Sequence, residues 1–321
     1  MTYSTGNLIA ATDYNTFTSG INTPWNTYYG QTALGTVATG GTVTAVQWDS
    51  VVNTIASLGN HQPTTITSRS APTAGTTIAA LANVQTDITN TSNNYLNAYA
   101  VGSQYTAWTG TSSKTAATGS GSAAWNITFT HTMTFASTAA MGYFFYAGGY
   151  VQLQFGKSST GTVADTEWNT FIGANGAGGV VAGKVIFTSS STSKTIASVA
   201  YTGTNKTGGT GTPSVLATGI GFAQLTGSAQ TIYTQYDTGT AYSGNYVTIT
   251  AYTSGSTIIF TTTWHDNGDT NPGSTAQISG GTATSGTTFG TAPTTILTYY
   301  PPETTYLTNS WGTPTVAATT A

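Results

Sequence analysis

The best metal-site candidate in the chain lies in the polar run between residues 265 and 271. It contains Asp266, Asn267, Asp269 and Asn271. Hard cations are bound by several oxygen ligands from a tight loop, so these four residues form a candidate Ca²⁺ site. The run lacks the bidentate glutamate of an EF-hand, and its Asn-Gly and Asp-Asn pairs are common turn formers. Because turn chemistry alone explains these residues, a polar turn is the preferred interpretation.

Catalytic chemistry has few candidates among the nine acids, three histidines and six basic residues. Asp165 and Glu167 could belong to a carboxylate pair of the kind that cleaves glycosidic bonds. A short helix is expected at 165–171, however. On such a helix, side chains two residues apart do not share a face, and acids at the helix start are explained by the helix dipole. We therefore assign no catalytic and no cofactor-binding residue, and keep a glycan depolymerase as the alternative function.

Aromatic and imidazole side chains could also serve a site. The chain has 19 Tyr and 7 Trp, and aromatic faces beside hydroxyl and amide groups suit neutral glycans. Most of these rings are needed to fill a core, so none is assigned individually. His131 lies on the apolar face of an expected strand and is predicted to be a core histidine. His61 is expected to cap a helix end as a cation.

Charge is scarce in this sequence. Only 5% of residues are charged, against about 25% in average soluble domains. With a net charge of −3 and six Lys and Arg, the chain lacks the electrostatic attraction that dominates nucleic-acid affinity, so nucleic-acid binding is not expected. No apolar run reaches the roughly 18 to 20 residues that span a bilayer. The start lacks a signal-peptide pattern, so we expect cytoplasmic synthesis without membrane insertion.

Two helices are expected near the N-terminus. Thr12 could cap the first, in which Tyr14, Phe17 and Ile21 recur at helical spacing. Thr44 could cap the second, and Gly59 stands where a left-handed C-terminal cap would lie. Its apolar stripe consists of Trp48, Val51, Val52, Ile55 and Leu58. Residues 1–105 are accordingly assigned as a helical attachment and oligomerisation region.

A third helical segment carries a possible self-association seam. Its apolar and polar positions follow one another at alternating steps of three and four, as in a coiled coil. They are Ile78, Leu81, Gln85, Ile88, Ser92, Tyr95 and Tyr99. A homotrimer built on this seam is expected. The alternative is a helix that packs inside one monomer, because short heptad runs also occur in ordinary amphipathic helices.

The pattern changes to period two after residue 111. Apolar residues at 125–135 alternate with Thr128, Thr130, Thr132 and Thr134, which is typical of a half-buried strand. Further strands are expected at 151–155, 184–189, 195–201, 221–225, 231–236, 246–252 and 257–264, with a hairpin turn at 253–256. This predicts a mainly β, antiparallel, sandwich or jelly-roll-like domain over 106–290. Residues 291–321, which contain Pro301, Pro302 and Pro314, are expected to form an extended C-terminal arm.

Several of these segments resemble virion structural and tail-fibre-like proteins of T4-like marine phages, particularly cyanophages. The N-terminal likeness is carried by YSTGNLI (3–9), DYNTF (13–17), YGQ (29–31), VQWDSVVN (46–53) and LGNHQ (58–62). The likeness of the β-domain is carried by TFAS (134–137), YFFYAGG (143–149) and WHDN (264–267). These are packing and turn motifs. One departure is the segment YVQLQ (150–154), which is uncharged where the family often has an arginine.

The resemblance implies a component of the virion, a fibre or surface appendage for particle assembly and adhesion. Its expected partners are further copies of itself, other virion proteins and a host surface glycan. Besides the depolymerase, a non-phage extracellular glycan-binding protein is an alternative. An ice-binding surface is a weaker one, because no fixed repeat of 20 to 50 residues is visible.

Overall fold

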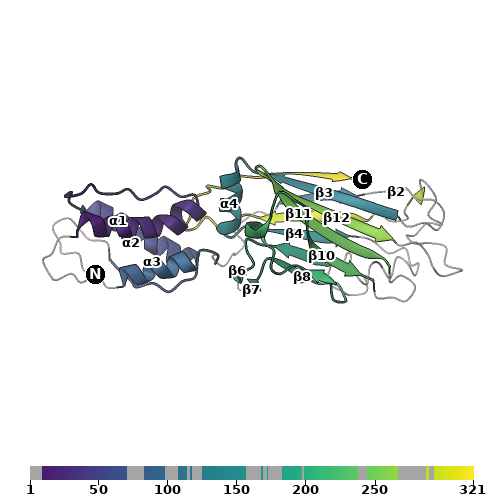
Figure 1. Cartoon of the computed structure of the whole chain (residues 1–321), viewed down its shortest axis with the longest axis horizontal. Coiled ribbons are helices and arrows are strands. Elements are labelled where there is room, and N and C mark those ends of the chain that lie inside the picture. The colour runs from purple at the N-terminus through teal and green to yellow at the C-terminus, as the bar shows by residue number, and fades with distance from the viewer. Residues whose placement is uncertain are drawn as a thin grey trace.

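The computed structural model describes residues 9–70, 83–97, 108–113, 116–117, 125–156, 168, 172, 183–196, 199–237, 244–266, 287–288 and 293–321. The molecule is elongated, with helices α1 to α3 at one end and a β-sandwich at the other (Figure 1). This confirms a mainly β, antiparallel sandwich with a helical N-terminal region. The jelly-roll assignment stays a prediction.

The helical region begins with α1 (Ala11–Asn22), which continues into a π-helical turn, η1 (Thr23–Tyr28). Ala10 is the N-cap residue and Thr12 lies inside the helix, so the cap predicted at Thr12 is wrong. Asn15 holds the later segment 34–37 against α1, because its carboxamide both donates to the Val37 carbonyl and accepts from the Val37 amide, each at 2.8 Å. Asn22 pairs with Leu34 in the same way.

Helix α2 (Ala45–His61) starts at the predicted cap. Thr44 and Gln47 form a reciprocal capping box in which the backbone amide of each residue donates to the side chain of the other. The predicted C-terminal cap at Gly59 is wrong, since the helix continues to His61. Gly59 serves close packing instead: a Cβ atom there would lie 2.9 Å from Ile66 Cγ2.

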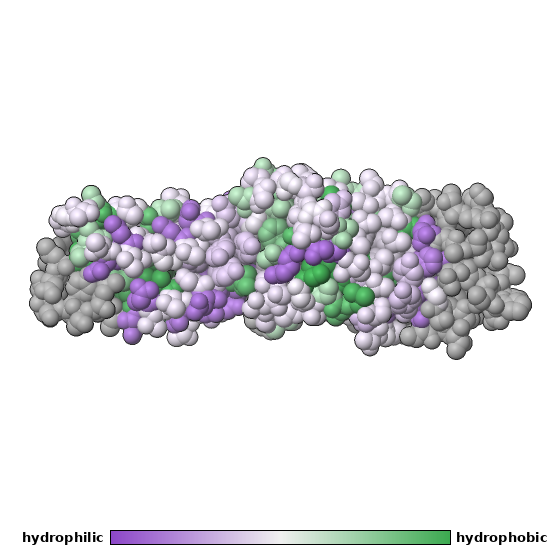
Figure 2. Space-filling view, in the orientation of Figure 1, coloured by the Kyte–Doolittle hydropathy of each residue, from purple (hydrophilic) through white to green (hydrophobic). Residues whose placement is uncertain are grey.

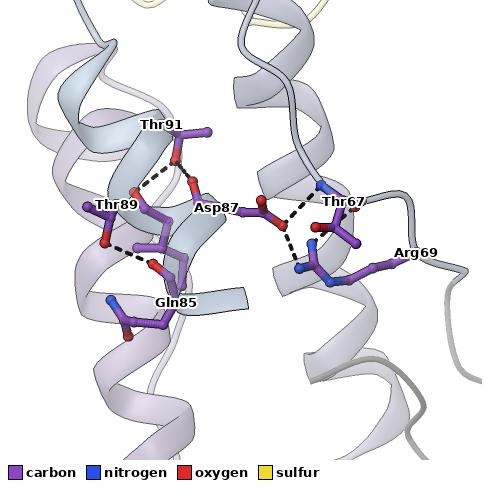
Figure 3. A network of polar contacts seen from close by, with 7 residues as sticks. Thr67, Arg69, Gln85, Asp87, Thr89 and Thr91 are labelled. Atoms are coloured by element: carbon purple, nitrogen blue, oxygen red, sulfur yellow. Dashed lines mark hydrogen bonds and ion pairs between the residues drawn. The ribbon is translucent and has the colours of Figure 1, made fainter. Parts of the chain in front are cut away.

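A buried ion pair holds α3 (Val84–Asn93) in the helical region (Figure 3). Arg69 pairs with Asp87 of α3, and both side chains are almost fully buried. Asp87 also accepts from the Thr67 amide at 3.2 Å, and Arg69 donates to the Thr67 carbonyl at 3.2 Å. The chain that follows α2 is therefore fixed to α3 by charge-assisted hydrogen bonds.

Two antiparallel sheets form the sandwich. The first has the strand order β1 (Trp108–Ser113), β14 (Thr294–Tyr300), β4 (Tyr150–Gly156), β5 (Lys184–Phe187) and β8 (Thr204–Thr207). The second has the order β15 (Thr315–Thr320), β3 (Trp125–Thr134), β12 (Thr257–Asp266), β11 (Tyr246–Ser254), β10 (Gln230–Tyr236) and β9 (Val215–Leu216). Short pairs join β2 (Ala116–Ala117) to β13 (Thr287–Thr288) and β6 (Lys194–Ile196) to β7 (Val199–Tyr201).

Aromatic rings fill the space between the sheets. Phe187 of the first sheet meets Phe260 of the second with ring centroids 5.3 Å apart. Trp264 contacts Phe155 across the core and stacks on Trp168 at 5.4 Å. On β3 the predicted alternation is confirmed, because His131 and its apolar neighbours on that face are buried while the threonines between them are partly exposed.

Helical segments also occur within the region expected to form the β-sandwich. Helix α4 (Thr138–Tyr146) is capped by Ser137, whose hydroxyl accepts from the Ala140 amide at 3.0 Å. The segment 222–224, inside a predicted strand, is a 3₁₀ turn, η3 (Phe222–Gln224). Phe222 of this turn stacks on Phe145 of α4, with the ring centroids 4.7 Å apart.

The expected C-terminal arm at 291–321 is wrong, because this segment is part of the sandwich. Strand β14 lies between β1 and β4, and β15 pairs with β3 at the edge of the other sheet. The connection between β14 and β15 runs to the helical end, where Leu307 and Trp311 are buried. Burial of these side chains and pairing of both strands fix the segment within its own chain.

Candidate functional site

The helical region and the sandwich meet at a buried junction. It is formed by η1 and the residues after it, the C-terminus of α2, helix α4 and the connection between β14 and β15 (Figure 1). Each of these segments contributes side chains that are buried or partly buried. We define the junction as the contacts among residues 28–31, 61–62, 143–147 and 307–311, with Tyr95 and Lys194 beside them.

Gln31 joins the two regions directly. Its side-chain oxygen accepts from the Thr308 amide at 2.8 Å and from the Thr308 hydroxyl at 2.6 Å. Its side-chain nitrogen donates to the Thr308 carbonyl at 2.9 Å and to the Tyr29 carbonyl at 2.9 Å. Gln31 is only 3% exposed, and an unpaired amide at such a depth is costly. The orientation of the two regions is therefore held by a satisfied buried polar group.

Tyr29 connects the junction to two helices. Its hydroxyl donates to the Tyr95 carbonyl at 2.7 Å and accepts from the Gln62 side chain at 3.0 Å. Burial raises the pKa of Tyr29 far above its ordinary value, so the phenol stays neutral. A neutral hydroxyl can both donate and accept, which is the role that this position requires.

His61 does not cap α2 as a cation, so that prediction is wrong. Its ring is fully buried and lies edge-on to Tyr29, with centroids 5.1 Å apart. Burial, together with the nearby charge of Lys194, lowers the pKa of His61 to about 3, with the Ala147 carbonyl opposing the shift. The imidazole is neutral at physiological pH, because the junction removes it from the water that a charged ring requires.

Lys194 is a second buried base at the junction. Its ammonium nitrogen donates to the Phe145 carbonyl of α4 at 2.7 Å and to the Ser189 hydroxyl at 3.3 Å. Burial lowers the pKa of Lys194 to about 7. The carbonyl at the C-terminal end of α4 accounts for the position of the amine, since helix C-termini attract cations.

Tyrosine rings close the outside of the junction. Tyr28 stacks on Tyr95 at 3.9 Å, and Tyr146 of α4 meets both rings. Gly30 has a positive φ of 66°, and a Cβ atom there would lie 2.4 Å from the ring of Tyr143. Glycine is required at this position on both counts, because only it combines the backbone conformation with the ring contact.

The junction brings together segments that are distant in the sequence. YGQ (29–31), LGNHQ (58–62) and YFFYAGG (143–149) each place residues in it. The described contacts are hydrogen bonds, ring stacking and close packing. The arrangement fixes one region to the other.

A second surface of interest is the outer face of the sheet that contains β3, β12, β11 and β10. Opposed threonines cover it in rows, such as Thr128–Thr263 and Thr234–Thr248, whose hydroxyl oxygens lie 3.5 and 2.8 Å apart. The visible described surface is mostly of intermediate hydropathy (Figure 2). At the sheet end far from the helices, the row changes to Tyr236, Tyr246, His265 and Asn126.

Of the four candidate cation ligands, the structure describes only Asp266. Asp266 ends β12 and is fully buried, while Asn267, Asp269 and Asn271 lie outside the described residues. Within the part of the chain that the structure describes, no group of three or more metal-ligating side chains occurs. Asp165 and Glu167 also lie outside the described residues.

The described residues of the predicted seam pack inside the chain. Ile88 is buried against α1, where a Cβ on Gly20 would lie 2.6 Å from it. Ser92 donates to the Gly20 carbonyl at 3.3 Å, and Tyr95 stacks on Tyr28. Gln85 is exposed, and Ile78, Leu81 and Tyr99 lie outside the described residues. These contacts favour the alternative of a helix internal to one monomer.

Comparisons with protein-family models, with curated proteins and with solved structures gave no match. Among the described helices, none is both long and apolar enough to cross a membrane.

The residues that sequence reasoning missed differ in how they could have been found. A two-residue turn at 255–256 sets Tyr246 opposite His265. The turn predicted over 253–256 would have set Tyr246 opposite Thr263, so the hairpin was predicted but not its register. Gln31 and Lys194 gave no such signal. Their partners, Thr308 and Phe145, are distant in the sequence, so only the tertiary structure identifies them.

Proposed function

We propose that this chain is a structural protein of a bacteriophage particle, a fibre or surface appendage for assembly and host-surface adhesion. The observation that carries the proposal is the junction. The segments in which the sequence resembles virion and tail-fibre-like proteins are distant along the chain, yet three of them supply residues to this one contact region. If this chain and the virion proteins that it resembles share one architecture of helical region and sandwich, they should also share the residues that join the two regions.

The physical character of the molecule supports the same proposal. An attached and displayed protein needs a defined axis, and here a satisfied polar contact fixes the helical region to one end of the sandwich. The helical region is the part assigned to attachment, and the sandwich is the part assigned to display. The face that the sandwich presents is hydroxyl-rich and has little charge, which suits contact with uncharged partners.

The location on a particle is tested by imaging. Antibodies raised against the purified chain are applied to phage particles from cultures that produce it, and the particles are viewed by electron microscopy. We expect label at a defined position on intact particles, with none after absorption of the antibody by free protein. Particles that contain the chain in no structural position, established by mass spectrometry of the purified particles, would refute the proposal.

A homotrimer is part of the proposal and is tested separately. The mass of the full chain is measured by light scattering at micromolar concentration. We expect a molar mass equal to that of three chains. A monomer over the whole concentration range would remove the trimer and agree with the intrachain packing of Ile88 and Tyr95.

A further inference from the structure

One row of side chains on the outer face of the sandwich differs from the threonine rows beside it. Tyr236 of β10, Tyr246 of β11, His265 of β12 and Asn126 of β3 lie opposite one another across the strands. The Tyr236 and Tyr246 ring centroids are 5.2 Å apart, and Tyr246 stacks on His265 at 4.5 Å. We call these four residues the aromatic row.

The polar end of the aromatic row is held in a fixed orientation. Nδ1 of His265 and Oδ1 of Asn126 are 2.7 Å apart. Because an amide oxygen can only accept, Nδ1 of His265 is the donor in this contact. The carboxamide of Asn126 is exposed. The stacked rings of Tyr246 and His265 therefore lie next to the oriented Asn126 amide, which can bind a hydroxyl group.

The other end of the aromatic row is Tyr236 of β10, beside the end of β9. Strand β9 ends opposite Thr234, so no residue of β9 lies across from Tyr236. Tyr236 is 45% exposed, one of the large side chains that the described chain leaves most open to solvent. Aromatic side chains usually bury much of their surface. A tyrosine loses little conformational entropy when it contacts a ligand, so an exposed tyrosine such as Tyr236 is suited to binding one.

The described strands β3, β10, β11 and β12 place no Asp, Glu, Lys or Arg on this face. Asp237 and Asp266 follow Tyr236 and His265 in the sequence, and both are buried. The adjoining row on the same face consists of the threonines Thr234, Thr248, Thr263 and Thr128. Rings, hydroxyls and an amide without charge match an uncharged polyhydroxyl ligand, and this face of the described strands has no lysine or arginine that would favour an anion.

We propose that the aromatic row is a binding site for neutral saccharides. A pyranose ring stacks on the open face of Tyr236, and its hydroxyl groups bind the tyrosine hydroxyls, Asn126 and the adjoining threonines. The inference rests on the proposed adhesion function and names the site and the ligand class for it. Weak binding at one such site becomes firm attachment when many copies act together.

The chain contains a matched control for this site. Tyr252 lies on the same strand and the same face as Tyr246, opposite Ile259 and next to the hairpin turn. Six residues of extended strand separate the two tyrosines, roughly 20 Å. The Tyr252→Ala variant therefore removes the same kind of side chain from the same face without touching the aromatic row.

The test uses the full chain and defined probes. Neutral hexasaccharides of α-glucose, β-glucose, galactose and mannose, with oligogalacturonate as the acidic comparison, are titrated and followed by saturation-transfer NMR. We expect at least one neutral probe to bind, with the acidic probe weaker. Tyr236→Ala and Tyr246→Ala should each weaken binding about fivefold to tenfold, the scale of one lost aromatic contact. Tyr252→Ala should leave it unchanged, and Tyr236→Phe should retain most of it.

The outcomes separate this inference from the proposed function. Absence of binding to every neutral probe, or equal loss in Tyr252→Ala and Tyr236→Ala, would overturn the saccharide site. Circular dichroism of each variant excludes misfolding as the cause of a loss. If particles are labelled by antibody while no probe binds, only the saccharide site fails. If probes bind while particles contain no such chain, the site stands and the protein is an extracellular glycan-binding protein instead.

Discussion

The helical region and the sandwich are stabilised in different ways. Specific polar contacts fix the helical region. They are the Arg69–Asp87 ion pair, the Thr44 capping box, and the two hydrogen bonds between the Asn15 carboxamide and the backbone of Val37. The sandwich relies on rings from both sheets, such as Phe155 and Trp264, and on long antiparallel pairings. Neither region uses many charges, but the helical region buries the only arginine of the chain.

The difference follows from the shape of the elements. Short helices expose most of their surface, and α3 contains Thr and Asn residues that form helices poorly, so tertiary contacts must hold it in place. Two facing sheets bury a continuous apolar layer and need fewer individual contacts. Removal of one polar partner should therefore affect the helical region as strongly as removal of a large ring affects the sandwich.

The largest effect is expected in the core of the sandwich. Trp264 is fully buried, touches rings of both sheets and donates to the Thr295 hydroxyl at 3.3 Å. Trp264→Ala should lower the free energy of unfolding by about 4 kcal/mol, as large-to-small changes in cores do. Urea denaturation followed by circular dichroism measures this. Thr263→Ala, on the partly exposed face of the same strand, is the control and should change it by less than about 0.5 kcal/mol.

A comparable loss is expected from one charge in the helical region. Arg69→Met leaves Asp87 buried without its partner and should cost about 3 kcal/mol. The double variant Arg69→Met with Asp87→Leu should recover most of this, because well-packed apolar residues replace a buried ion pair at little cost. Chemical denaturation of the native chain and the two variants gives the comparison. A single variant as stable as the native chain would show that the ion pair is not needed.

A smaller effect at the junction would show how strongly the two regions are coupled. Gln31→Met removes the hydrogen bonds to Thr308 and leaves the Thr308 amide without its partner, while the Thr308 carbonyl still accepts from the Ser310 amide. We expect a loss of about 2 kcal/mol, since unmet buried polar groups cost that much. Calorimetry should resolve one thermal transition into two as the regions uncouple. One unchanged transition would mean that ring packing at Tyr28, Tyr95 and Tyr146 suffices to couple them.

The smallest expected effect depends on pH. The pKa of Lys194 is about 7 in the folded chain against an ordinary 10.5. Between these two pH values the Lys194 amine is protonated only in the unfolded chain, so the free energy of unfolding rises with pH. Below pH 7 the amine is protonated in both states, and its contribution to the free energy of unfolding no longer changes with pH. Lys194→Met should remove about 1 kcal/mol per pH unit from that rise. Unfolding measured from pH 7.5 to 9.5 avoids the titration of His61, which lies at lower pH.

Much of the sandwich could be predicted from local pattern. Alternation fixed the bounds of β3 and β10 to β12 closely, and the buried His131 followed from its place in that alternation. The cap at Thr44 was predictable because a capping box depends on residues three apart. Helix α4 was missed, since its residues are apolar on nearly all sides and such a run resembles a buried strand.

The candidate sites divide in the same way. The hairpin of β11 and β12 was predicted, but Tyr246 lies opposite His265 only because its turn is confined to 255–256 and not extended over 253–256. The burial of His61 and Lys194, the pairing of Gln31 with Thr308, and the use of Ile88 inside the chain required the tertiary structure. The physical reason is that strand register and helix caps are set by neighbours in sequence, whereas burial is set by partners that only the folded chain brings together.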